Sequence, residues 1–157
     1  MLEKYLQILD ESLDQKLEIL TDIEDKSKEQ SEMIVNDISL DEIDRNMDEK
    51  SELIDKINKM DDGFQAMYDK IKDELNEHKG EFSDQIDRLK KKIMLVIEKN
   101  TSIEAIEARN KAAMEKRFAV EHRSNSDRIS AATAARSYYE VANKLNAITP
   151  QFMDQKN

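Results

Sequence analysis

Side chains that could bind a metal ion are few in this sequence, and their spacing does not bring them together. Leucine and alanine stand three residues before the two histidines, His78 and His122. A di-metal site in a helical bundle instead needs a glutamate three residues before each histidine. We therefore expect both histidines to be surface or helix-capping residues, and we expect no metal site.

The residues from Asp37 to Asp48 resemble a calcium-binding loop only at their start. The sixth position of such a loop needs glycine for a sharp turn, and the twelfth provides a bidentate glutamate. Glu42 and Asp48 occupy these positions here. Ser39, with Glu42 three residues later, is instead typical of the capping box at the start of a helix. The pattern therefore predicts a helix start and no calcium site.

The other residue types used in catalysis are not arranged as a site either. The chain has no cysteine, so a thiol nucleophile and a disulfide framework are excluded. With two glycines in the whole sequence, it has no glycine-rich phosphate loop. The serines of the last third lack a nearby base and acid that could activate them. We expect a protein that is not an enzyme and needs no cofactor.

The composition indicates which elements hold these side chains. Of the 157 residues, 38% are charged and 38% are hydrophobic, and there is one proline besides the two glycines. Residues that form turns are too scarce for a sheet with many connections, whereas long helices are typically rich in Ala, Glu, Lys and Leu. The sequence therefore predicts an all-α protein.

Charge and hydropathy indicate where in the cell the protein works and which classes of partner it does not bind. The first 16 residues carry acids and no unbroken apolar core, unlike a signal peptide. The longest apolar run, Ile93 to Ile97, is too short to cross a membrane. Residues 1–80 hold 24 acids and 11 bases, an excess that disfavours binding to nucleic acid or anionic lipid. We expect a cytoplasmic protein with no nucleic-acid partner and no membrane insertion.

Three stretches repeat apolar residues at intervals of three and four, as the buried face of an amphipathic helix does. The first contains Leu2, Leu6, Leu9, Leu13, Leu17, Leu20, Ile23 and Ile34. The second contains Leu40, Ile43, Met47, Ile54, Ile57, Phe64, Met67, Ile71 and Leu75. The third contains Phe82, Ile86, Leu89, Ile93, Val96, Ile97, Ile103, Ile106, Met114 and Phe118. The predicted reversals lie near Asn36-Asp37 and at His78–Gly80, where we expect Gly80 to provide a left-handed cap.

These helices cannot bury their apolar stripes alone, so they must pack on one another. The near-heptad spacing predicts an elongated antiparallel bundle of coiled-coil-like helices over residues 1–122. Asn100 and Asn110 lie on or beside the seam, where polar residues fix register or partner choice. Lys50 stands at an apolar position, so we expect loose packing there or a stem that reaches solvent. The sequence leaves open whether the bundle closes within one chain or as a homodimer.

Residues 123–157 form a separate C-terminal part in this interpretation. Hydrophobicity falls around residues 122–127, residues 126–148 have the pattern of an amphipathic helix, and Pro150 ends it. This segment either docks on the chain's own bundle or binds a partner helix. The candidate partner-binding residues are Ala131, Ala135, Tyr138, Tyr139, Val141, Ala142, Leu145, Ile148, Phe152 and Met153.

The order of these segments resembles the FlgN family of flagellar type III export chaperones. The resemblance rests on the capped second helix with Asp-Glu-Lys-Ser-Glu-Leu-Ile at 48–54 and on the spaced asparagines of the third helix, Asn100 and Asn110. It also rests on the ending Pro-Gln-Phe-Met-Asp-Gln-Lys at 150–156, which is similar to that of FlgN-like proteins of Gram-positive flagellated bacteria. It covers nearly the whole chain.

The resemblance implies a cytoplasmic chaperone that binds the C-terminal helices of hook-associated proteins. Such a chaperone prevents their premature polymerisation and delivers them to the flagellar export apparatus. Two alternatives come from other classes. A structural coiled-coil scaffold without a secreted client would form a stable homo-oligomer, and a metal-binding or enzymatic helical bundle would contain a bound metal.

Overall fold

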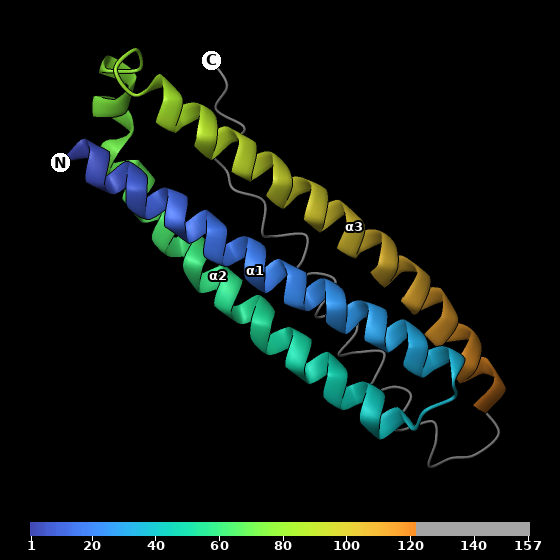
Figure 1. Cartoon of the computed structure of the whole chain (residues 1–157). Coiled ribbons are helices and arrows are strands. Elements are labelled where there is room, and N and C mark those ends of the chain that lie inside the picture. The colour runs from blue at the N-terminus through green and yellow to red at the C-terminus, as the bar shows by residue number, and fades with distance from the viewer. Residues whose placement is uncertain (122–157) are drawn as a thin grey trace.

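The computed structural model describes residues 1–121, which form three long helices joined by two short connections (Figure 1). Helix α1 spans Leu2–Val35, α2 spans Leu40–Glu77 and α3 spans Ser83–Glu121. Consecutive helices run antiparallel, so α1 and α3 point the same way. The predicted all-α bundle is confirmed for this part of the chain.

The helix ends follow local chemistry, with one difference from the prediction. The Ser39 hydroxyl accepts the backbone N–H of Glu42 at 3.4 Å and caps the start of α2, as predicted. After α2, the N–H of His78 donates to the carbonyl of Leu75 at 3.1 Å in a tight turn. The prediction of a left-handed cap at Gly80 is wrong, because neither glycine has a positive φ. Asp37 takes that conformation instead (φ 56°) after α1, which aspartate tolerates better than most residues.

Nine of the ten buried positions of α1 follow an unbroken alternation of three and four residues, as in a coiled coil. They are Leu2, Leu6, Leu9, Leu13, Lys16, Leu20, Ile23, Ser27 and Gln30, and the tenth buried residue is Glu24. The strict heptad therefore places Lys16 in the interior, whereas Leu17, which we expected there, is half-buried. The prediction for Leu17 is therefore only partly correct: its side chain packs against the core but stays partly exposed, because the heptad phase gives the interior position to Lys16.

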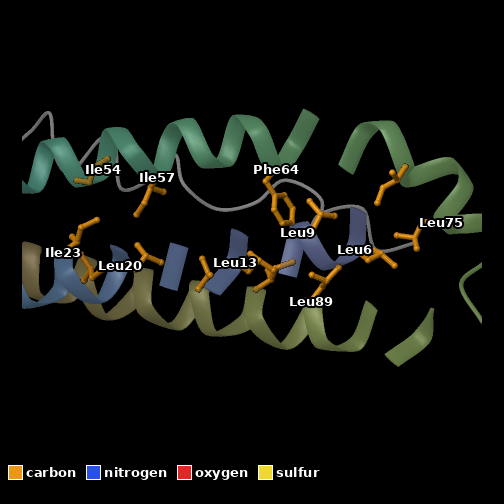
Figure 2. Close-up of a cluster of buried hydrophobic side chains, with 14 of the residues drawn as sticks. Leu6, Leu9, Leu13, Leu20, Ile23, Ile54, Ile57, Phe64, Leu75 and Leu89 are labelled. Atoms are coloured by element: carbon orange, nitrogen blue, oxygen red, sulfur yellow. The ribbon is translucent and has the colours of Figure 1, made fainter. Parts of the chain in front are cut away.

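The main hydrophobic core begins at the end of the bundle that holds the N-terminus and the α2–α3 connection, and it extends as far as Ile23, Ile54 and Ile103 (Figures 1 and 2). Leu6, Leu9 and Leu13 of α1 pack there with Phe64 of α2 and Leu89 of α3. Full burial of one such side chain is worth about 1.5–3 kcal/mol. Helix α1 packs closely against both other helices, so its stripe is the centre of the fold.

A second, smaller core lies near the α1–α2 connection and the end of α3. Its buried members are Ile43, Met47 and Met114, with Met33 and Phe118 packed against them among partly buried side chains. Methionine fills irregular space and tolerates changes of shape. The bundle therefore has a large leucine-rich core at one end and a small methionine-rich core at the other.

Candidate functional site

All ten candidate partner-binding residues, from Ala131 to Met153, lie outside the described residues, as does the predicted boundary at residues 122–123. The assignment of these residues to a binding site stays a prediction. Within residues 1–121, the polar side chains that interrupt the core are the most unusual feature. These polar side chains come from all three helices.

A buried layer of polar side chains separates the two hydrophobic cores. Lys50 of α2 is fully buried, and its ammonium donates to the Glu107 carboxylate of α3 at 2.6 Å. It also donates to the side chain of Gln30 of α1. The Ser27 hydroxyl of α1 donates to the same Glu107 oxygen at 2.5 Å. The expectation that the Lys50 stem reaches solvent is therefore wrong, because a buried carboxylate and a buried amide oxygen accept hydrogen bonds from its ammonium.

The layer continues through asparagines that bond to the backbone of α1. Asn110 of α3 donates to the Ser27 carbonyl at 2.9 Å and accepts from the Ser31 hydroxyl at 2.5 Å. Asn46 of α2 donates to the Lys26 carbonyl at 3.1 Å. Each bond forms at one axial position of the paired helices only, so it fixes their register. The prediction of a seam position for Asn110 is confirmed, and Asn100 is buried as well.

Several polar atoms of this region have no hydrogen-bond partner among the described residues. They include both polar atoms of the Asn100 amide, whose side chain is 5% exposed, and Oε2 of Glu107. Nε2 of Gln30 and Oδ1 of Asn46 are also without a partner there. A buried polar atom left without a partner costs about 1–3 kcal/mol. The layer is therefore only partly satisfied by residues 1–121.

Burial shapes the electrostatics of the interior ion pairs. Desolvation lowers the pKa of Lys50, against the attraction of Glu107. A second pair joins Lys16 of α1 to Asp61 of α2 at 2.7 Å. Burial lowers the pKa of Lys16 and raises that of Asp61, and their mutual attraction opposes both shifts. Each pair stabilises the bundle only while both partners are present, because a lone buried charge is very costly.

Ion pairs at the α1–α3 boundary hold these parallel helices together at the surface. Lys92 of α3 lies 2.8 Å from both Asp10 and Asp14 of α1. Glu24 of α1 accepts from Lys99 at 3.1 Å and from the Ser102 hydroxyl at 2.8 Å. Burial alone would raise the pKa of Glu24, but these bonds and the nearby lysines outweigh it and lower the pKa below its ordinary value of 4.5.

This shift predicts a measurable dependence of stability on pH. A carboxylate with a lowered folded-state pKa stabilises the fold above its unfolded-state pKa, and that contribution is lost as the pH falls through the folded-state value. We expect Glu24→Gln to be less stable than the wild type at pH 7 and to approach it at pH 3. Urea unfolding followed by circular dichroism measures both differences. Asp25→Asn, at an exposed position of the same helix, is the control, and a gap that stays constant with pH contradicts the prediction.

The rest of the described surface offers little chemistry. A shallow depression between α1 and α3 is lined mainly by polar side chains, among them Glu3, Asp10 and Arg88. His78 is exposed at the end of α2, 3.4 Å from Glu81, in agreement with the predicted surface role. In residues 1–121, no group of three His, Cys, Asp or Glu side chains could hold a metal ion, and no helix could cross a membrane.

The polar layer was only partly visible in the sequence. Asn100, Asn110 and Lys50 stand out as polar residues on apolar stripes, whereas Ser27, Gln30 and Glu107 were missed. A strict heptad extended from Leu2 through Ile23 would have placed Ser27 and Gln30 inside. Comparison of the chain with protein-family models, curated proteins and solved structures found no match.

Proposed function

We propose that the protein is a FlgN-like flagellar export chaperone. In this proposal, residues 126–148 and Phe152-Met153 bind the C-terminal helices of hook-associated proteins, keep them from polymerising early and bring them to the export apparatus in the cytoplasm. The observation that carries the proposal is the order of segments. Three long heptad-patterned helices are followed by a 36-residue part that holds three of the eight aromatic residues.

Two features of the described residues support this role. The helices α1 and α2 have net charges of −6 and −7 and α3 has +2, so residues 1–121 carry a net charge of −12, as suits a soluble carrier. The polar layer joins all three helices and would hold the bundle in one register while another segment exchanges partners. A client helix would then bind the apolar stripe of residues 126–148, next to a bundle whose helices keep a fixed register.

The test is a titration of a hook-associated protein's C-terminal helical peptide against the full chain. We expect binding, and we expect the double variant Tyr138→Ala/Leu145→Ala to bind at least about 30-fold more weakly, because buried aromatic and aliphatic anchors are worth about 2 kcal/mol or more. Isothermal calorimetry measures both affinities. Circular dichroism verifies that the variants are folded.

Leu95→Ala is the matched control, since Leu95 is an apolar side chain on α3 that is 49% exposed. It should bind like the wild type. Equal affinities for the wild type and the double variant would exclude residues 126–148 as the binding segment. Absence of binding to every version would exclude the chaperone function itself.

A structural coiled-coil scaffold is the second candidate, and the unbroken heptad of α1 favours it. A scaffold of this kind forms a stoichiometric homo-oligomer with no affinity for the client peptide. Light scattering coupled to size-exclusion chromatography distinguishes the two. A dimer that persists at low micromolar concentration, together with no peptide binding, would favour the scaffold.

A further inference from the structure

The three helices do not share their contacts equally. Close backbone packing joins α1 to α3 and α1 to α2, whereas α2 and α3 are linked through long side chains such as Lys50 and Glu107. Three helices arranged in this way leave one corner of a four-helix bundle to be filled. The corner lies diagonally opposite α1, between α2 and α3.

The residues that border this corner can be identified from the helical repeat. On α3, Lys92 and Lys99 pair with α1, and the residues five positions later lie about 140° further around the helix. On α2, Asn46 bonds to α1, and Ser51 is likewise five positions later. The α2–α3 face is therefore bordered by two lines of residues at seven-residue intervals: Asp44, Ser51, Asn58 and Gln65 of α2, and Ile97, Glu104, Lys111 and Phe118 of α3.

Buried polar atoms point to an occupant of this face. Asn100 follows Ile97 by one helical turn, is 5% exposed, and has a carboxamide with no partner among the described residues. Glu107 follows Glu104 by one turn, and its buried carboxylate oxygen Oε2 also has no hydrogen-bond partner among the described residues. Because an unpaired buried amide is costly, a segment that hydrogen-bonds to Asn100 would stabilise the fold.

We propose that residues 126–148 of the same chain form a fourth helix that returns along the α2–α3 face, antiparallel to α3. The described part of α3 reaches Glu121, at the end of the bundle where the α1–α2 connection lies (Figure 1). A reversal over residues 122–125 starts the return there. Twenty-three helical residues extend about 35 Å, which reaches the level of Ile97.

The residue order of the segment suits this register. If residue 126 lies beside 121, the alanine-rich part from Ala131 to Ala135 lies near Met114 and Phe118, so small side chains meet large ones. Asn146, at the edge of the apolar stripe of the segment, then lies within one turn of Asn100 and can pair with its amide.

The net charges of the C-terminal segment and of the bundle can also be compared. Residues 122–157 hold five bases and three acids, a net charge of +2, while residues 1–121 have a net charge of −12. The segment is therefore opposite in sign to the bundle as a whole and to α2, whose net charge is −7, whereas α3, on the other side of the face, has a net charge of +2. This docking does not depend on the proposed chaperone function. If both hold, the apolar stripe of residues 126–148 is covered until a client helix displaces it.

The test uses the full chain, which has no cysteine, so two introduced cysteines take spin labels only where intended. Thr101→Cys, at an exposed position of α3, is paired with Ala147→Cys. Docking predicts a narrow distance distribution near ~20 Å in a pulsed dipolar measurement, because packed helices lie about 8–10 Å apart and the labels add their own length. A helix continuing straight from α3 would separate the sites by about 70 Å.

The pair Thr101→Cys/Ser126→Cys is the matched control. If residues 126–148 run antiparallel to α3, the labels of this control pair lie about 35 Å apart. This distance is longer than that of the first pair, although the two residues are closer in sequence. A broad distribution for the first pair, centred near ~40 Å as expected for 20 helical residues of α3 followed by 26 flexible ones, overturns the proposal. So does loss of the short distance on dilution with unlabelled protein, which would assign the face to the segment of a second copy.

Discussion

Replacement of Lys50 by methionine is expected to lower the free energy of unfolding by about 3–5 kcal/mol, the largest effect of any single change considered for this bundle. The ammonium of Lys50 is fully buried and lies 2.6 Å from the Glu107 carboxylate. Removing it leaves a buried negative charge, together with Gln30 without its donor. Urea unfolding followed by circular dichroism at neutral pH measures the loss.

The double variant Lys50→Met/Glu107→Met should recover most of that stability, because an apolar pair of similar volume often replaces a buried ion pair without loss. With the single variant Glu107→Met and the wild type, these variants form a double-mutant cycle that measures the coupling of the two side chains. Lys56→Met, at an exposed position of α2, is the control and should stay within about 0.5 kcal/mol of the wild type. A Lys50→Met protein as stable as the wild type would show that the ion pair does not stabilise the bundle.

Truncation of Leu13 to alanine is expected to cost about 2–5 kcal/mol. Leu13 is 1% exposed and packs in the main core between α2 and α3 (Figure 2). Alanine is the best helix former, so the loss reports the removed side chain and the cavity and not the helix itself. Chemical denaturation measures the change.

Ile8→Ala tests the same helix at a position that is 39% exposed. Its apolar side chain is already partly in water, so we expect a much smaller loss than for Leu13→Ala. Comparable losses for the two variants would contradict the placement of Leu13 at the centre of the fold.

The helices themselves were predictable because their signals are local. Most residues of the stripes predicted for α2 and α3 are buried, and the others, such as Met67 and Ile86, are partly buried and pack against the core. Ser39 marked the start of α2 correctly. Caps and three-to-four spacing depend on residues within one or two turns, so they can be recognised in the sequence alone. The turn after α2 was placed correctly but its geometry was not, since the backbone there closes without a left-handed glycine.

The interior polar residues could not be predicted in the same way. Asn100 and Asn110 were recognised on the seam, yet Lys50 was expected to escape the core. Its partner, Glu107, is 57 residues away in sequence and on another helix. Asp61, the partner of Lys16, is 45 residues away. No local pattern contains such a pairing.

The sequence by itself determined that residues 1–121 form three long helices with defined faces, because periodicity and capping act within each helix. Only the tertiary structure decided which charged residues those faces bury, because burial of a lysine is tolerable only where another helix brings a carboxylate. It also decided that α1 is the central helix and that α2 and α3 do not pack closely, since this depends on how three stripes share one core. The face left between α2 and α3 follows from that arrangement and from no single segment.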